Sequence, residues 1–140
     1  MVIIDKKLLD EVSAQAKATP RLRKNYNFHP SVDDLCYRML NALEPGTAIP
    51  IHHYSGKDET FVILRGKIRV TTYNDDGIVA ERVILSQEDG RYGVNISKNV
   101  CHTLEALEPN SCIFESKQGS FVPHEKEGVL KITPKQQKHF

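Results

Sequence analysis

Short apolar segments separated by turns run from residue 36 to residue 117, and this pattern constrains the fold more than any other feature. Alternating or β-branched runs bounded by Gly, Pro, Asn and Asp are typical of strands. Asn74-Asp75-Asp76-Gly77 carries the Asp-Gly signal of a hairpin. No segment between these runs has the helical spacing that a parallel α/β fold needs. The sequence therefore predicts an all-β sandwich or barrel, with strands at residues 36–43, 48–54, 60–64, 67–73, 78–85, 92–96, 100–107 and 112–117.

One helix is predicted before these strands. Residues 5–18 carry an apolar stripe at helical spacing, Asp5 can cap the first turn, and Thr19-Pro20 ends the pattern. We expect this helix to pack on the sheet. The predicted organisation is an N-terminal helix and arm over residues 1–30, a β-barrel over residues 31–119, and a polar C-terminal tail over residues 120–140.

Composition narrows the class of protein. The chain has 140 residues and a formal net charge of +1, which suits one domain and provides no long-range field for nucleic acid or anionic lipid. The basic run at residues 21–24 is interpreted as a solvated loop that enters a strand. Three cysteines without C-x-x-C spacing indicate a reducing compartment, and no apolar stretch approaches the roughly 20 residues of a membrane span. We therefore expect a cytoplasmic protein that binds a small molecule rather than nucleic acid or a membrane.

Three polar residues that are distant in the sequence are candidate metal ligands. His52 shares one strand face with Tyr54, whereas His53 faces the other way. Glu59 opens the next predicted strand, and a hairpin would bring it opposite His52; His102 comes much later. Two imidazoles and a carboxylate form the facial triad of non-haem iron sites, and the same set suits catalytic zinc. If the three side chains converge, the sequence predicts a site for a divalent metal, with iron, zinc and manganese all compatible.

The order of these residues resembles the two sequence motifs of the cupins. The first motif reads G-x5-H-x-H-x(3,4)-E-x6-G, and the stretch GTAIPIHHYSGKDETFVILRG matches it at Gly46, His52, Glu59 and Gly66. The second motif includes P-x-G-x-x-H. Here SKNVCH keeps His102 but places Ser97 and Asn99 at the proline and glycine positions. Asn tolerates the left-handed conformation, so the turn before His102 can survive.

A longer stretch points to one branch of the cupins. PRLRKNYNFHPSVDDLCYRMLNALEPGT resembles the segment that precedes the barrel in the WbuC family of cupin-fold metalloproteins, and the resemblance runs from about the first helix to about Lys117. It implies a small cytoplasmic cupin, with a double-stranded β-helix (jelly-roll barrel), that is often encoded with enzymes of O-antigen or capsular polysaccharide biosynthesis. It also implies a homodimer, because cupins often cover exposed sheet edges by pairing.

The main departure from the cupin pattern is Tyr54, which stands where the family has its second histidine. Four interpretations remain open. Tyr54 lines the pocket beside a three-ligand site, or its phenolate binds the metal, or a bulge turns His53 inward, or the site has lost its metal. As a phenol beside a metal, Tyr54 is also the candidate catalytic residue, because it can donate or accept a proton there.

Other side chains are candidates for the pocket wall. Asn27 and His29 alternate along one face of the segment before residue 30, and the resemblance implies that they rim the pocket. Arg38 and Asn41 lie on opposite faces of one predicted strand, so at most one of them points inward. An inward Arg38 would offer a guanidinium fork to a carboxylate or phosphate.

These observations support more than one function. The first hypothesis is a metal-dependent enzyme that acts on a small sugar-derived or carboxylate metabolite, by isomerisation, epimerisation or oxygenation. The second is a non-catalytic binding protein with a degenerate metal site, which the tyrosine at position 54 favours. The third is a metal-free epimerase that uses His52 with Glu59 as its carboxylate partner and Tyr54 as its acid.

Overall fold

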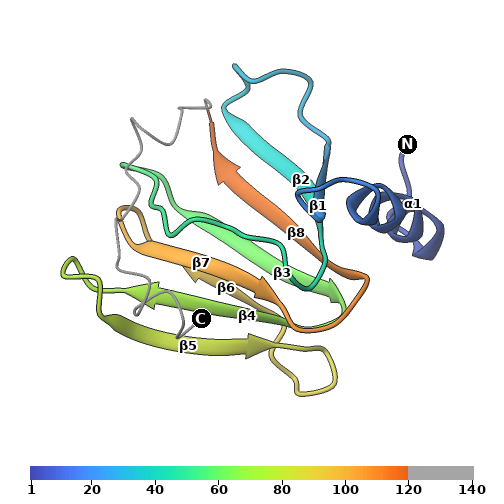
Figure 1. Cartoon of the computed structure of the whole chain (residues 1–140). Coiled ribbons are helices and arrows are strands. Elements are labelled where there is room, and N and C mark those ends of the chain that lie inside the picture. The colour runs from blue at the N-terminus through green and yellow to red at the C-terminus, as the bar shows by residue number, and fades with distance from the viewer. Residues whose placement is uncertain (120–140) are drawn as a thin grey trace.

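The computed structural model describes residues 1–119, so the predicted C-terminal tail, residues 120–140, lies outside the described residues. Within that range the chain forms one helix and then strands (Figure 1), and the expectation of an all-β fold with an N-terminal helix is confirmed. No helix among residues 1–119 is long and apolar enough to cross a bilayer. The elements are α1 (Lys6–Lys17), β1 (Arg23–Asn27), β2 (Cys36–Leu43), β3 (Glu59–Arg65), β4 (Ile68–Tyr73), β5 (Val79–Leu85), β6 (Gly93–Ile96), β7 (Cys101–Ala106) and β8 (Ser111–Gln118).

The strands form two antiparallel sheets that face one another. One sheet has the order β1-β2-β8-β3-β6 and the other has the order β5-β4-β7 (Figure 1). Side chains from both inner faces meet in a single apolar core, as expected for stacked sheets. Its most buried members include Phe61, Ile63, Ile68, Leu85 and Ile113.

Helix α1 begins where its capping residue predicts. The side chain of Asp5 accepts a hydrogen bond from the backbone N–H of Leu8 at 3.0 Å, which satisfies one of the free N–H groups of the first turn. The buried face of the helix, which includes Val12 and Ala16, packs against Ala42 of β2. The helix thus covers the outer side of the five-stranded sheet at its β1–β2 edge (Figure 1).

Two segments differ from the sequence-based expectation. Residues 23–27, expected within an arm, form the edge strand β1, which pairs antiparallel with β2. Residues 48–54, expected as a strand, make only one isolated bridge, between His52 and His102. Pro50 lies in this segment and has no backbone N–H to give to a ladder, so regular pairing cannot extend through it.

Asn99 has the left-handed conformation expected at the turn before β7, with a φ of 68°. This turn sets the direction in which β7 begins, and His102 is the second residue of β7.

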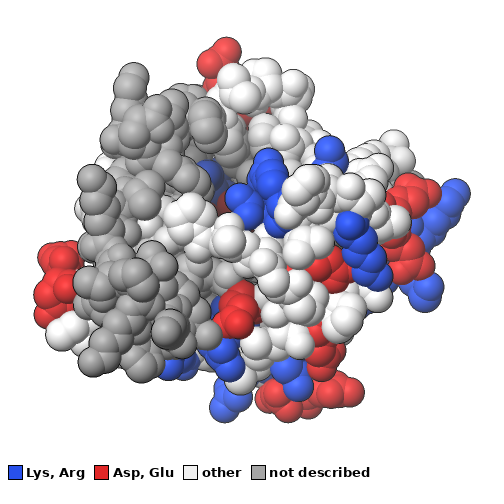
Figure 2. Space-filling view, in the orientation of Figure 1, with Lys and Arg blue, Asp and Glu red and all other residues white. Residues whose placement is uncertain are grey.

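Basic and acidic side chains are interspersed over the face of the molecule shown in Figure 2, in line with the net charge of +1.

Candidate metal centre

His52, Glu59 and His102 meet inside the barrel. One ligand atom from each residue lies within 4.8 Å of the others. All three side chains are buried, with exposed fractions of 6%, 2% and 1%. Because a carboxylate is almost never fully buried without a partner, Glu59 needs a stabilising interaction at this point.

Both histidines are oriented by backbone carbonyl groups. The Nδ1 atom of His52 lies 2.8 Å from the carbonyl oxygen of Pro50, and Nδ1 of His102 lies 2.8 Å from that of Val100. A carbonyl oxygen can only accept, so each Nδ1 carries a hydrogen and donates it. The lone pair of a neutral imidazole is then on Nε2, the arrangement that metal-binding histidines usually have.

The carboxylate of Glu59 faces His102. Its Oε1 contacts Nε2 of His102, and neither atom has another hydrogen-bond partner among residues 1–119. Burial by itself would raise the pKa of the Glu59 carboxyl, but the contact with His102 and the nearby basic side chains lower it below its usual value. Glu59 is thus held as a carboxylate, the form that binds a cation. Because its oxygen and the Nε2 lone pair of a neutral His102 would repel one another, a cation between them would resolve the contact, and the donor set fits a divalent metal.

Glu59 reaches the site by a different route from the one expected. The hairpin that would place it opposite His52 does not form, because β3 pairs with β6 and β8. His52 instead bridges to His102 of β7, in the other sheet. The carboxylate therefore approaches the two imidazoles from across the barrel.

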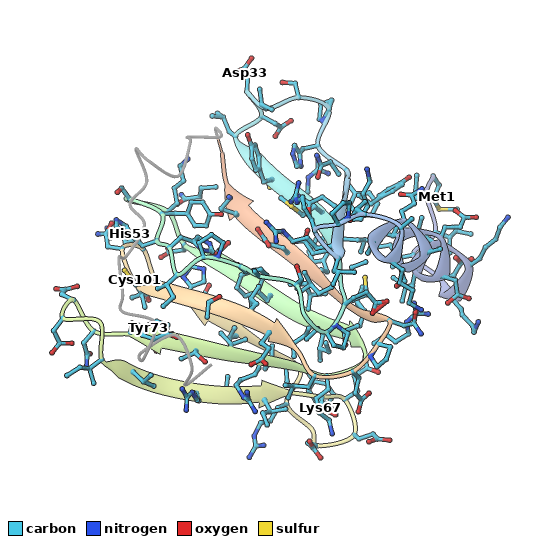
Figure 3. All side chains as sticks on the ribbon, in the orientation of Figure 1. Met1, Asp33, His53, Lys67, Tyr73 and Cys101 are labelled. Carbon is cyan, nitrogen blue, oxygen red and sulfur yellow. The ribbon has the colours of Figure 1, made fainter. Side chains whose placement is uncertain are left out.

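Tyr54 and His53 point in different directions. Tyr54 lines the pocket, and its ring meets that of His52 edge to face with centroids 5.2 Å apart. Nζ of Lys117 lies 3.6 Å from the centroid of the Tyr54 ring. The ring of His53 approaches the thiol of Cys101, with Nδ1 3.6 Å from Sγ, at the side of the barrel visible in Figure 3. The structure thus places Tyr54, and not His53, beside the three candidate ligands.

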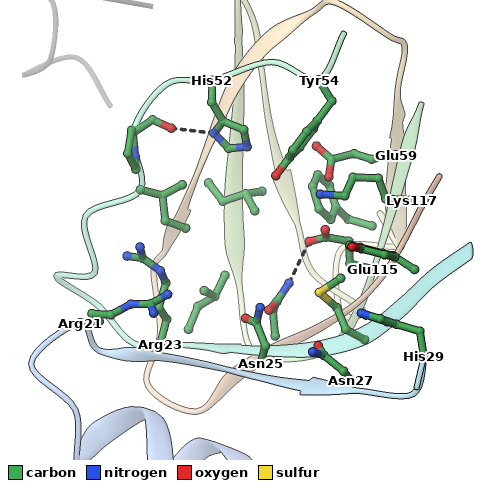
Figure 4. Close-up of a pocket in the computed structure, with 18 of the residues that line it drawn as sticks. Arg21, Arg23, Asn25, Asn27, His29, His52, Tyr54, Glu59, Glu115 and Lys117 are labelled. Atoms are coloured by element: carbon green, nitrogen blue, oxygen red, sulfur yellow. Dashed lines mark hydrogen bonds between the residues drawn. The ribbon is translucent and has the colours of Figure 1, made fainter. Parts of the chain in front are cut away.

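A pocket of about 380 Å³, lined by both polar and apolar side chains, extends from this centre along the inner face of the five-stranded sheet (Figure 4). Asn27 and His29 are among the residues that line it. His29 accepts the backbone N–H of Arg38 and stacks on Tyr37, with ring centroids 4.2 Å apart. Arg38 itself is exposed and is not part of the wall, because the alternation of β2 turns Tyr37, Met39 and Asn41 inward. The guanidinium fork considered for Arg38 is therefore absent from the pocket.

Several wall residues were missed by sequence reasoning. Glu115 and Lys117 come from β8, whose register places Lys117 between Tyr37 and Glu59. Alternation along β8 predicts that Glu115 and Lys117 share one strand face. Only the pairing register shows that this face points into the barrel. Arg21 and Arg23 also line the pocket, although the basic run that contains them was interpreted as a solvated loop.

Glu115 is a second buried carboxyl group beside the centre. The side-chain amide of Asn41 donates to its Oε1 at 2.8 Å. Burial and the neighbouring charge of Glu59 raise the pKa of Glu115 to about 8. Between pH 4.5 and pH 8 the Glu115 carboxyl therefore stays protonated in the folded protein but loses its proton in the unfolded chain. As the pH rises through this range, Glu115 progressively lowers the stability of the metal-free fold.

Glu115→Gln should remove this pH dependence, because the amide is neutral and keeps an oxygen for Asn41. The wild type should lose stability as the pH rises, and the variant should not. We therefore expect the difference in free energy of unfolding between variant and wild type to increase by about 3 kcal/mol from pH 5 to pH 8. Urea unfolding in the presence of a chelator measures this change. Glu88→Gln, at an exposed site, should show no such trend, and parallel pH profiles for Glu115→Gln and the wild type would contradict the assignment.

Comparison with solved structures defines the class of fold. The chain is similar to KdgF from a Halomonas species (17% identity, TM-score 0.55), covering 71% of this chain and 82% of KdgF. It is also similar to a cupin superfamily protein from Desulfitobacterium hafniense DCB-2 (17% identity, TM-score 0.54, 69% and 76% covered). A third similar structure is the capsular polysaccharide assembling protein CapF from Staphylococcus aureus (18% identity, TM-score 0.56), where the match covers 74% of this chain but only 28% of CapF. The two facing sheets are thus a cupin jelly roll.

The sequence comparison supplies the family. Residues 4–85 match the family model described as a domain of unknown function (DUF6016), and the chain belongs to this family. No curated protein sequence matches the chain. The matched region includes His52 and Glu59 but ends before His102.

Proposed function

We propose that this protein is a cupin-fold metalloprotein that binds one divalent iron, zinc or manganese ion through His52, Glu59 and His102. The observation that carries the proposal is the convergence of two buried imidazoles and one buried carboxylate within 4.8 Å. Support also comes from the carbonyl contacts that leave both Nε2 atoms available. Three protein ligands leave coordination positions open for water or a substrate.

We further propose that the protein acts on a small sugar-derived or carboxylate metabolite. A bound metal would supply Lewis acidity or activate water or dioxygen. Tyr54 lines the pocket beside His52, so its hydroxyl would exchange a proton with a substrate held there. Asn27 and His29 would form part of the wall that orients the substrate. Isomerisation, epimerisation and oxygenation are the reaction types that this arrangement suits.

A role in the biosynthesis of surface polysaccharide is the biological setting that we propose. Its support is the resemblance of residues 20–47 to the WbuC family, together with the fold shared with the capsular polysaccharide assembling protein CapF. The homodimer implied by the same resemblance stays a prediction, which size-exclusion chromatography with light scattering would test.

Metal analysis of the purified protein tests the proposal directly. We expect about one iron, zinc or manganese ion per chain after growth in medium that contains all three, or after reconstitution of the chelated protein. Tyr54→Phe should retain the same metal content, because the proposed role of the phenol is proton transfer. A loss of metal in Tyr54→Phe would make the phenolate a ligand, and absence of metal under every condition would overturn the metal site.

The second candidate is a non-catalytic binding protein with a degenerate metal site. The tyrosine at position 54, where cupins usually have a histidine, favours it. In that case the chelated protein should bind small metabolites with unchanged affinity, and metal addition should alter neither affinity nor chemistry. Titration of the same ligand with and without metal separates the two candidates.

A further inference from the structure

Two arginines form the end of the pocket that lies away from the candidate metal centre. Figure 4 shows Arg21 and Arg23 side by side there, with Asn25 and Asn27 following along β1 toward the other end. Glu59, Glu115 and Lys117 lie on the opposite side of the view, and His52 lies above and between the two groups. The pocket therefore has two chemically different ends.

The register of the sheet shows how far apart these ends are. Along the inner face, Glu59 is paired with Lys117, and Lys117 with Tyr37. Arg23 is paired with Leu43, six residues further along β2 than Tyr37. Six residues of a strand span about 20 Å between Cα atoms. The long Arg23 side chain shortens this separation, because its guanidinium donates to the carbonyl oxygen of Ala48, four residues and at most about 14 Å before His52. A ligand that contacts both must be extended, with different groups at its two ends.

The arginine pair is built into the fold through Thr47, which is buried. The hydroxyl of Thr47 donates to the carbonyl oxygen of Arg21 at 2.6 Å and lies 3.3 Å from Nη1 of Arg23, which can donate to it. Nη1 of Arg23 also donates to the carbonyl oxygen of Ala48 at 2.8 Å. Leu22, between the two arginines, has a left-handed backbone with a φ of 58°, which is uncommon for a residue with a branched side chain. The guanidinium of Arg23 and the backbone of Arg21 are therefore constrained before any ligand arrives.

Within residues 1–119, the charges of this pair are not balanced by carboxylates. Among residues 1–119, neither Arg21 nor Arg23 makes an ion pair with a carboxylate. The pKa of Arg23 is lowered by partial burial and by the adjacent charge of Arg21, which shows that the two cations oppose one another. By contrast, Lys117 lies near Glu59 and Glu115, which its charge stabilises. An anion at the arginine end would relieve a repulsion that residues 1–119 leave in place.

Between the two ends, the wall carries side-chain amides. Asn25 and Asn41 are paired across β1 and β2, and Asn27 lies one inner-face position further along β1. Each amide offers both a donor and an acceptor, the combination that hydroxyl groups match. The lining of the pocket thus changes from cationic groups, through amides, to His52 and Glu59, two of the three candidate metal ligands.

We propose that Arg21 and Arg23 form an anion subsite that holds the carboxylate or phosphate of a polyhydroxylated substrate, so that its opposite end meets the metal centre. This inference rests on the proposed function, because it assigns the orientation of the substrate in the same pocket. Carboxylate and phosphate share the geometry that an arginine fork recognises. The anionic group is therefore an anchor and not the group that reacts.

Calorimetric titration with matched sugars tests the subsite. The probes are glucose 6-phosphate, gluconate and neutral glucose, each added to the metal-reconstituted protein. We expect at least one of the acids to bind about tenfold more tightly than glucose, because one additional charge-assisted interaction contributes about that factor. A preference for glucose 6-phosphate would identify phosphate as the anchor, and a preference for gluconate would identify carboxylate. Equal or absent binding of the acids and glucose would overturn the proposal.

Two variants and one matched control complete the test. Arg21→Gln and Arg23→Gln should each weaken binding of the preferred acid by about tenfold. Lys24→Gln removes the same charge from the neighbouring position on the opposite face of β1, and it should change affinity by less than about twofold. If Lys24→Gln weakens binding as much as Arg21→Gln, the effect is a general one of net charge and the subsite is refuted.

Metal analysis of the same samples separates this proposal from the proposed function. The arginine variants should keep the full metal content of the wild type. Arginine-dependent binding of acids to a protein that never holds metal would support the subsite and refute the metal centre. If the protein holds stoichiometric metal but its affinity for acids does not depend on either arginine, the metal centre is supported and the subsite is refuted.

Discussion

His102→Ala is expected to abolish stoichiometric metal binding. The substitution removes one of three candidate ligands from a buried centre whose ligand atoms lie within 4.8 Å of one another. Loss of a residue that only orients a ligand costs 10–100-fold in affinity, so loss of a ligand itself should cost more than about 100-fold. Metal content of the purified variant, measured by mass spectrometry of the elements, should fall to a small fraction of that of the wild type.

Two further variants distinguish lost ligation from lost structure. Glu59→Gln keeps the size and shape of the side chain but removes the charge, so it should lose metal while its unfolding curve stays cooperative. His53→Ala removes the adjacent imidazole, whose Nδ1 lies 3.6 Å from Sγ of Cys101, and it should retain metal. Full metal content in both His102→Ala and Glu59→Gln would show that the ion binds elsewhere, and loss in His53→Ala would show that the wrong imidazole had been assigned.

Gly66→Ala is expected to produce a large loss of stability. Gly66 has a φ of 83°, and a Cβ at this position would lie 2.7 Å from Cα of Ser111, at the start of β8. Ser111 is fully buried, accepts the backbone N–H of Lys67 and donates to the carbonyl oxygen of Glu108. The added methyl group must therefore displace backbone that other hydrogen bonds hold in place. We expect a loss of about 3 kcal/mol or more in urea unfolding.

Gly90→Ala is the matched control for Gly66→Ala. Gly90 has a similar φ of 71°, but nothing lies within 4 Å of the position that a Cβ would occupy. Its substitution should cost only the backbone term, about 1 kcal/mol. The difference between the two variants isolates the close approach of Gly66 to β8. Equal losses would mean that this approach contributes nothing and that the left-handed backbone accounts for the whole effect at both sites.

Much of the fold was predictable because its signals are local. The limits expected for the strand at residues 36–43 match β2, and Asp5 caps α1 as expected. These features depend on side-chain alternation and on hydrogen bonds between near neighbours. The edge strand β1 was missed because its sequence is mostly polar, and its pairing with β2 is what makes it a strand.

The candidate site was predictable in part for the same reason. Alternation placed Tyr54 on the same face as His52 and turned His53 away, and the cupin-like order of residues added Glu59 and His102. The path of Glu59 was predicted incorrectly, because the sequence suggested a local hairpin and the strand pairs instead with β6 and β8. Arg38 and Asn41 could not be distinguished, since alternation separates two faces without showing which of them is the inner one.

The sequence by itself determined the all-β class, the position of the helix and which residues share a strand face, because these properties depend on neighbours within a few positions. Only the tertiary structure decided that β8 lies between β2 and β3, and so brought Glu115 and Lys117 beside Glu59. The tertiary structure also decided that Arg21 and Arg23 line the pocket and that Arg38 does not. Strand order and register depend on hydrogen bonds and packing between segments that are distant in the chain, and no short stretch of sequence encodes them.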